Sequence, residues 1–485
     1  MMNYVVQGYE PTALFRFFEE ISAIPRGSGN EAAIADYLVA FAEARGFFYL
    51  RDALNNVFIR KPASQGCEDK PAVMLQGHTD MVCEQNEGTG HDFETEGLEL
   101  YVEDGWLKAR GTTLGGDDGA AVALMLCLLD DGEAVHPTLE CLFTTGEETG
   151  LFGATAFDYS VVTAKKLINL DSEAEGVATV SCAGGIGMDF RLVPDRLPIP
   201  AIARPLSIEL NGLVGGHSGA DIILERGNAC ILLGQMLAAL YETHPFSLVT
   251  ISGGSRGNAI PREAKAVLFT DEPQEATEFL KAYAKTVKEW LPREDQAFRV
   301  RVEKAKGTWD SMLSYADTSR LLSLVSLFPN GVIARMRDIP NMVETSNNLG
   351  VIRDEGEDGI LLIYHGRSSL DSKMDILARS AAQMAKALDL SLDINGRYSG
   401  WPMKDGSVLV KDFMAATKTV FGEACEPRVE AIHAGLECGI ICGAVPGLDA
   451  ISIGPELRGI HAPGEAMNLA SFARLYTLVC ELLKC

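Results

Sequence analysis

The sequence lacks the features that mark membrane and secreted proteins. No apolar run reaches the roughly 20 residues that a membrane-spanning helix needs. Residues 1–20 hold no basic segment followed by an apolar stretch, so no secretory signal is expected. The 11 cysteines are scattered without a CxxC pair, which indicates neither a thiolate zinc site nor a disulfide framework. We therefore expect a cytoplasmic protein with no membrane partner.

Basic residues are also scarce. Lys and Arg number 42 against 67 Asp and Glu, which gives a formal net charge of -25. A field of that sign repels a polyphosphate, so nucleic acid is not an expected partner. The hydrophobic fraction of 47% is typical of a folded globular protein, and 485 residues exceed what one ordinary core holds. The composition therefore predicts two or more domains.

The order of apolar patterns predicts how these domains are arranged. The first third alternates short apolar runs with a helical stretch at 119–132, and the runs lie at 72–77, 139–145 and 166–171. Buried strands separated by helices indicate an α/β layer, with a mostly parallel sheet and helices on both faces. Amphipathic strands follow at 206–213 and 298–305, with a hairpin at 350–366, and the α/β rhythm then returns. We predict one α/β domain in two parts, 1–185 and 388–485, interrupted by an α+β lid at 186–387.

Polar, metal-competent side chains lie at the ends of the predicted strands or in the adjoining turns. They are His78, Asp80, Asp117, Asp118, Glu147, Glu148, Asp171 and His461. Ligands of open α/β sheets gather at the carboxyl ends of strands, so a common site is expected there. Carboxylates and imidazoles without cysteine suit zinc, cobalt or manganese, and a bridging carboxylate holds two metals roughly 3.5–4 Å apart. Strand alternation puts His78 and Asp80 on one side, so Asp80 can accept from the second ring nitrogen of His78.

The phrases HTD, GGDDG, GEETG, LDSE and GIHAPGE resemble the co-catalytic zinc peptidase family. That family includes acetylornithine deacetylase, carboxypeptidase G, tripeptide aminopeptidase, carnosinase and the aminoacyl-histidine dipeptidases. The resemblance, from His78 to His461, implies two Zn²⁺ ions, with Co²⁺ or Mn²⁺ as possible substitutes. Its implied ligands are His78 and Asp171 for one ion, Glu148 and His461 for the other, and Asp117 as the bridge. It further implies Glu147 as general base, Asp80 as the residue that orients His78, and a cis peptide after Asp117. Asp118 is expected to support the turn rather than to contact a metal.

The resemblance also implies substrate-binding residues and a specific activity. His217 is implied as an oxyanion donor, Asn258 and Arg367 as ligands of the substrate carboxylate, and Glu437 as a partner of the substrate amino group. The aspartate at position 171 is similar to that of aminopeptidase and dipeptidase members, and the phrases HAGLECG and GIHAPGE most resemble the bacterial aminoacyl-histidine dipeptidases. The lid is expected to mediate a homodimer.

These implications predict a metal-dependent hydrolase of dipeptides. Its substrates include Xaa-His dipeptides such as β-alanyl-histidine. A zinc-bridging hydroxide is the expected nucleophile. A tripeptide aminopeptidase, a carboxypeptidase and an N-acyl-amino-acid deacylase are the alternatives within hydrolases. A non-catalytic scaffold that keeps the fold is a more remote one. A panel of dipeptides, tripeptides and acyl amino acids separates the hydrolases, and a metal count with one dipeptide assay separates the scaffold.

Overall fold

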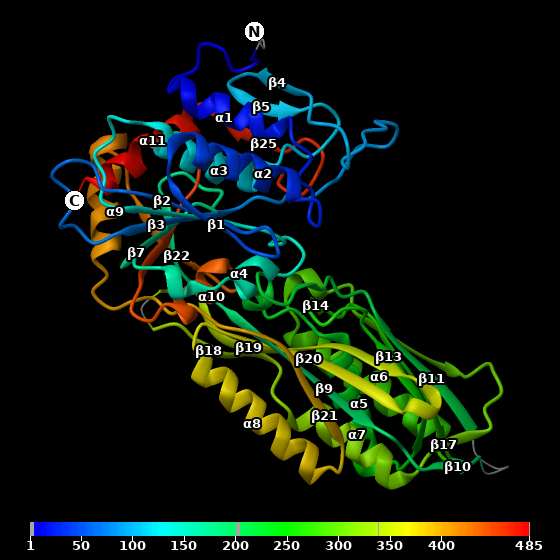
Figure 1. Ribbon diagram of the computed structural model, residues 1–485. Coiled ribbons are helices and arrows are strands. Elements are labelled where there is room, and N and C mark those ends of the chain that lie inside the picture. The colour runs from blue at the N-terminus through cyan, green and yellow to red at the C-terminus, as the bar shows by residue number, and fades with distance from the viewer. Residues whose placement is uncertain (1–3, 200–203, 338, 485) are drawn as a thin grey trace. The chain divides into compact units, whose positions relative to one another are not determined.

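The chain divides into two compact units. Figure 1 colours their helices and strands by residue number. The computed structural model describes residues 4–199, 204–337 and 339–484. Unit 1 comprises Met1–Ser181, Trp401–Ala431 and Leu436–Cys485, and unit 2 comprises Cys182–Gly400 and Ile432–Gly435. Unit 2 runs past residue 387, where the sequence placed its end. The reason is strand β21 (Ser391–Tyr398), whose mostly exposed residues give little apolar signal although it pairs with β9 (Gly184–Leu192) of unit 2.

The main sheet of unit 1 is parallel at its centre. Its strand order is β1-β2-β6-β3-β7-β23-β8-β22. The parallel strands are β6 (Leu139–Thr144), β3 (Val73–His78), β7 (Lys166–Asn169) and β23 (Asp449–Ser452). Antiparallel pairings join the outer strands β1 (Phe48–Arg51), β2 (Val57–Lys61) and β8 (Val177–Cys182), and β22 (Arg428–Ile432) forms the last edge. The central strands are buried along almost their whole length, which explains their nearly continuous apolar sequence.

Helices lie on both sides of this sheet, as predicted. Figure 1 shows on one side α1 (Thr12–Ser22), α2 (Ala32–Arg45), α3 (Gly116–Asp130) and α11 (Leu469–Leu483), and on the other α4 (Phe152–Ala156) and α10 (Glu437–Ala444). Helix α9 (Val408–Phe421) contacts α11 and β23. Gly46 ends α2 in the left-handed conformation, with a φ of 67°, which glycine adopts without strain. Helix α3, which begins at the GGDDG phrase, is buried along nearly its whole length.

A small antiparallel sheet completes unit 1. It joins β24 (Leu457–Arg458), β25 (Ala466–Asn468), β5 (Trp106–Ala109) and β4 (Leu100–Glu103), in that order. It therefore brings the segment after β5 alongside the segment before β25. Among the described residues, no helix is both long enough and apolar enough to cross a membrane.

Unit 2 is built on one long antiparallel sheet. Its order is β16-β11-β15-β13-β19-β20-β9-β21, with β18 (Gly331–Arg335) paired to β19. The remaining strands are β11 (Arg204–Asn211), β13 (Ser247–Gly253), β15 (Ala264–Thr270), β16 (Arg299–Lys304), β19 (Val343–Asp354) and β20 (Ile360–Ser368). The hairpin predicted at 350–366 is confirmed as the β19–β20 pair. Two short pairs stand apart, β10 (Arg196–Pro198) with β17 (Ser311–Leu313) and β12 (Gly216–His217) with β14 (Ala259–Ile260).

Four helices of unit 2 contact this sheet. They are α5 (Ala229–Thr243), α6 (Pro273–Trp290), α7 (Tyr315–Leu327) and α8 (Asp371–Ala387), and their apolar side chains form one core with those of the strands. Leu362 and Tyr364 of β20 belong to that core. Because side chains alternate along a strand, His365 and Arg367 point to the face opposite these four helices. This face of unit 2 carries the predicted substrate-binding arginine.

Candidate active site and metal centre

The predicted ligands of unit 1 meet at one edge of the central sheet. His78 is the last residue of β3, Glu147 and Glu148 follow β6, and Asp171 follows β7. These three strands are parallel neighbours, so their carboxyl ends lie together. The sequence-based expectation of a common site rested on this one property of parallel sheets.

The imidazole of His78 lies between carboxylates. Its Nε2 is 3.0 Å from Asp117 Oδ1 and 3.8 Å from Asp171 Oδ1. Its Nδ1 is 3.1 Å from the carbonyl oxygen of Asp80 and 3.4 Å from Asp80 Oδ1. Both of these Asp80 atoms are acceptors, so Nδ1 donates to them, and Nε2 is the ring nitrogen that faces Asp117 and Asp171. This geometry is the one a metal-ligating histidine needs.

Asp80 is fixed by donors from three directions. Its carboxylate accepts hydrogen bonds from Ser28 Oγ at 2.7 Å and from the backbone N–H groups of Glu147 and Glu148 at 3.1 and 3.3 Å. Burial alone would raise the pKa of Asp80, but His78 and these hydrogen bonds lower it to about 2. Asp80 therefore stays ionised beside His78, and it ties the strand end of β3 to the loop that carries Glu147 and Glu148.

His461 faces the other side of Asp117. Its Nε2 is 3.1 Å from Asp117 Oδ2 and 3.1 Å from Glu148 Oε2. Hydrogen bonds to Asp117 and to Glu148 raise the pKa of His461 to about 10. Two carboxylate oxygens thus converge on one ring nitrogen, a position that attracts positive charge. The Asp117 carboxylate lies between the two imidazoles and presents one oxygen to each. The peptide bond between Asp117 and Asp118 is cis.

The donor set fits divalent metal ions. Ligand atoms lie within 4.8 Å of one another in three groups: His78 with Asp118 and Asp171, His78 with Glu147 and Glu148, and Asp117 with Glu148 and His461. Glu148 Oε1 is buried and has no hydrogen-bond partner in the part of the chain that the structure describes. A buried carboxylate oxygen without a donor is costly unless a cation neutralises it. The oxygen and nitrogen donors, with no thiolate among them, match the preferences of zinc, cobalt or manganese.

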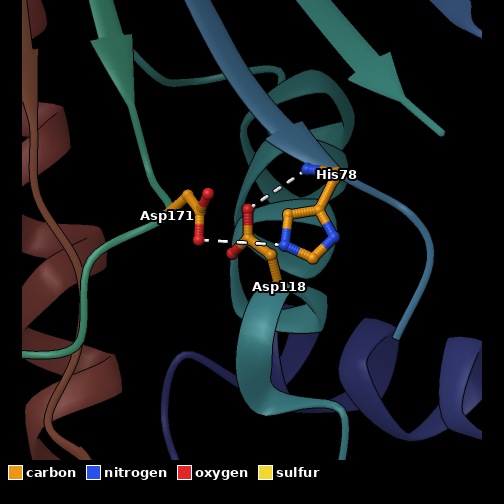
Figure 2. A group of neighbouring side chains, drawn as sticks. All are labelled: His78, Asp118 and Asp171. Atoms are coloured by element: carbon orange, nitrogen blue, oxygen red, sulfur yellow. Dashed lines mark hydrogen bonds and ion pairs between the residues drawn. The ribbon is translucent and has the colours of Figure 1, made fainter. Parts of the chain in front are cut away.

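Asp118 belongs to the support of the site. Figure 2 shows the Asp118 carboxylate beside His78, where the contact runs to the backbone N–H and not to the ring. Asp118 Oδ2 accepts from the His78 N–H at 3.2 Å, and Oδ1 accepts from the Ala121 N–H at 3.3 Å. The dashed line from the ring of His78 in Figure 2 ends at Asp171. With a backbone donor on each oxygen, Asp118 supports the turn.

Glu147 has the environment of a proton acceptor. Burial raises the pKa of its carboxyl group to about 8, against the effect of His78 and with the help of the charges on Glu437, Glu148 and Asp117. A carboxylate with a pKa near neutrality takes and returns a proton more readily than an ordinary glutamate. Glu147 therefore combines a place next to the ligands with a raised affinity for a proton.

Glu437 is more deeply buried than its predicted contact with a substrate amino group requires. It has no exposed surface. Its Oε2 accepts hydrogen bonds from Thr144 Oγ1 at 2.7 Å and from Gln76 Nε2, and burial raises its pKa to about 7. Its Oε1 is buried without a hydrogen-bond partner among the described residues. Glu437 thus lies beneath the strand ends of β3 and β6, at the beginning of α10.

His217 lies on the short strand β12 of unit 2, and Asn258 directly precedes its partner strand β14. His217 of β12 is paired with Ala259 of β14, and the N–H of Ser218 donates to the carbonyl of Asn258 at 2.9 Å. The Nδ1 of His217 accepts from the N–H groups of Gly219 and Ala220, at 3.3 and 3.1 Å. The ring proton is therefore on Nε2, and burial, with the charge of Arg367, lowers the pKa of His217 so that the ring is neutral at pH 7. His217 thus offers one N–H donor.

Arg367 is a buried cation with few partners. It is 5% exposed, Nη1 donates to Tyr398 Oη at 3.0 Å, and Nε has no hydrogen-bond partner in the described ranges. Burial, followed by the charge of Arg367, lowers the pKa values of His365 and His433 to about 3. A guanidinium among neutral imidazoles is a site for an anion such as a carboxylate.

Asn348 and Tyr398 support these groups and were missed in the sequence. Asn348 Nδ2 donates to the carbonyls of Gly257 and Ala259, at 3.1 and 2.9 Å, and so holds both neighbours of Asn258. Tyr398 is the partner of Arg367 on the edge strand β21. No local motif surrounds either residue. Only the pairing of distant strands reveals what they contact.

Known proteins resemble the chain along almost its whole length. It is 35% identical over 478 residues to the cytosol non-specific dipeptidase of Escherichia coli (strain K12), covering 98% of this chain and 97% of that protein. The crystal structure of aminoacylhistidine dipeptidase from Vibrio alginolyticus superposes with a TM-score of 0.93 at 34% identity, covering 98% and 97% of the two chains. A tripeptidase from Staphylococcus aureus shares the fold, with a TM-score of 0.59 at 16% identity and 98% coverage of both chains. Residues 74–484 match peptidase family M20/M25/M40, and the chain therefore belongs to that family.

Proposed function

We propose that this chain is a dipeptidase that hydrolyses Xaa-His and other dipeptides, β-alanyl-histidine among them. The observation that carries the proposal is the cluster of His78, Asp117, Glu148, Asp171 and His461 around the edge of the unit 1 sheet. The dipeptidase names of the two relatives at 34% and 35% identity support the substrate class.

We propose two zinc ions as the resident metals, with cobalt or manganese as substitutes. His78 and Asp171 would hold one ion, Glu148 and His461 the other, and Asp117 would contact both. When bound, such metals lower the pKa of a water molecule and polarise a carbonyl group. The Nδ1–H of His78, held by Asp80, keeps Nε2 available as a ligand.

The protein's own groups move the proton. Glu147 takes a proton from the attacking water and returns it to the leaving amine, as a general base and then a general acid. The Nε2–H of His217 donates to the developing oxyanion, a contact worth about 3 kcal/mol where such donors have been removed. Arg367 and Asn258 bind the free carboxylate of the substrate, which limits its length to two residues. The role of Glu437 toward the substrate amino group stays a prediction. The full burial of its carboxylate gives that role no support.

The test couples metal content to substrate choice. The purified protein is expected to contain about two metal ions per chain, to lose dipeptidase activity on chelation, and to regain it with Zn²⁺. β-Alanyl-histidine, other dipeptides, tripeptides, acyl amino acids and carboxypeptidase substrates are compared under the same conditions. Hydrolysis of tripeptides or acyl amino acids in preference to every dipeptide would refute the proposed specificity.

We further propose a cytoplasmic homodimer formed through unit 2. The cytosolic designation of the Escherichia coli relative supports the location. Light scattering coupled to size exclusion measures the mass, and a mass near 52.3 kDa at all concentrations would contradict the dimer.

A further inference from the structure

Glu465 binds the backbone of the loop that carries Asp117. It is 2% exposed. Its Oε2 accepts from the N–H groups of Leu114 and Gly115, at 2.8 and 2.9 Å. Its Oε1 accepts from those of Gly116 and Asp117, at 2.7 and 3.3 Å. One carboxylate thus satisfies four successive N–H groups at the beginning of α3, which have no partner within the helix.

The same glutamate lies on the segment that carries His461. Only three residues separate His461 from Glu465, and β25 begins directly afterwards. The N–H of Gly464 donates to the carbonyl of Thr112 at 3.4 Å, a second tie between the two segments. Glu465 therefore connects the backbone position of Asp117 to that of His461.

Arg26 holds the opposite side of the Asp117 loop. It is 1% exposed. Its Nη1 donates to the carbonyls of Thr79 and Asp80, at 3.0 and 3.2 Å, and its Nη2 donates to that of Gly115 at 2.6 Å. The residues that follow β3 and His78 are thereby linked to the same turn that Glu465 binds.

The glycines of the GTTLGGDDGA phrase make room for this arrangement. A Cβ on Gly115 would lie 2.5 Å from Arg26 Nη2, and one on Gly119 would lie 2.6 Å from the same atom. A Cβ on Gly116 would lie 3.1 Å from Glu465 Oε1. Gly115 also has a φ of 64°, which side chains rarely adopt. The turn is therefore shaped to admit one buried carboxylate and one buried guanidinium.

We propose that Glu465 is a positioning residue for the metal centre, which fixes Asp117 relative to His461 and so sets the metal affinity. The inference rests on the metal site of the proposed function. Asp117 presents one oxygen to His78 and the other to His461, so a shift of its backbone changes both contacts. Glu465 touches neither imidazole and acts through the backbone of Asp117.

The experiment compares Glu465→Gln with a matched variant, Glu140→Gln. Glu140 is 0% exposed and also accepts from successive N–H groups, those of Thr163 and Ala164. It lies at the opposite end of β6 from the ligands, so its loss should lower stability without reaching the metals. An amide in place of Glu465 turns one of its two acceptors into a donor that faces N–H groups. Zn²⁺ affinity is measured by competition with a chromogenic chelator, the Co²⁺ form by its visible absorption, and stability by thermal unfolding.

We expect Glu465→Gln to weaken Zn²⁺ binding by about 10- to 100-fold, the usual cost of losing a group that orients a ligand, and to alter the Co²⁺ spectrum. Glu140→Gln should stay within about threefold of the wild type. A Zn²⁺ affinity of Glu465→Gln within that range, or an equal loss in Glu140→Gln, overturns the proposal. If Glu465→Gln does not fold, Glu465→Asp replaces it, with a smaller loss expected and an unchanged affinity counting against the proposal. A wild type that binds Zn²⁺ but cleaves no dipeptide refutes the proposed function and leaves this inference standing.

Discussion

Glu147 and Glu148 are adjacent in the chain, yet we expect their amide variants to fail in different ways. Glu148 Oε2 faces the ring of His461, whereas Glu147 is the proposed proton acceptor. Glu147→Gln keeps the size of the side chain and the backbone N–H that Asp80 accepts at 3.1 Å. This variant should therefore fold, bind its metals and bind substrate, and lose only the transfer of a proton.

The size of the loss follows from that role. Removing a positioned general base typically costs 10²- to 10⁴-fold in rate, or about 2.7–5.5 kcal/mol of transition-state stabilisation. We expect this loss in kcat, with KM for β-alanyl-histidine within about threefold of the wild type. Glu148→Gln should lose a metal ligand as well, so its Zn²⁺ content should fall along with kcat.

The assay measures kcat, KM and bound Zn²⁺ for both variants on one dipeptide. Excess Zn²⁺ is expected to restore part of the activity of Glu148→Gln and none of that of Glu147→Gln. A Glu147→Gln protein with full metal content and a rate within tenfold of the wild type would refute the assignment of Glu147. Equal metal loss in both variants would show that the two glutamates do not have separate roles.

Three further predictions concern other parts of the chain. Arg367→Ala should raise KM for dipeptides by about 10- to 150-fold, the cost of one charge-assisted hydrogen bond; an unchanged KM removes Arg367 from substrate binding. Burial, with the charge of Arg367, lowers the pKa of His433 to about 3. Below pH 6.5 the imidazole of His433 is therefore protonated in the unfolded chain but not in the folded protein. The free energy of unfolding then falls by about 1.4 kcal/mol for each unit by which the pH is lowered. Urea unfolding of the metal-free protein is measured between pH 6 and pH 5. The free energy of unfolding of His433→Asn should fall less steeply with decreasing pH than that of the wild type, by this amount; equal slopes would contradict the reasoning. Gly77→Ala should cost about 1–3 kcal/mol of stability in the same assay, because its Cβ would collide with Ala121 and Asp118. An unchanged unfolding midpoint would show that the strand can move away.

The sequence predicts those elements that have a strong apolar pattern. The runs at 72–77, 139–145 and 166–171 are β3, β6 and β7, and their polar ends meet because parallel neighbours end at one edge. The hairpin at 350–366 was also predictable from the sequence, since a polar turn separates two apolar strands. Helix α8, by contrast, was missed, because few of its residues are buried and its polar positions dilute the pattern.

Long-range partners explain what local patterns could not reveal. Ser28 and Glu31 have the spacing of a capping box, yet α2 begins without a side-chain cap. The hydroxyl of Ser28 donates instead to Asp80 at 2.7 Å, and Glu31 accepts from the N–H of Gly146 at 3.2 Å. Both residues therefore contact segments that form the site. A pattern of neighbouring residues in the sequence cannot reveal a partner that lies far along the chain.

The support of the site was harder still to foresee. Glu465 stands in the phrase GIHAPGE, which pointed to His461, but nothing in it indicates four backbone N–H groups as its partners. Arg26 has no motif around it. Its burial becomes intelligible only once three backbone carbonyls from two loops surround its guanidinium group.

The insertion of unit 2 sets an order of folding during synthesis. Strand β7 ends at Asn169, while its parallel neighbour β23 begins at Asp449, after the whole of Cys182–Gly400 has been made. Most of unit 2 is thus available to fold from one continuous stretch, whereas the sheet that carries His78 and Asp171 must wait for the last segment of the chain. Until then β7 presents an open edge, the condition in which strands pair wrongly. The proposed metal centre, which includes His461, is therefore among the last features that a nascent chain can assemble.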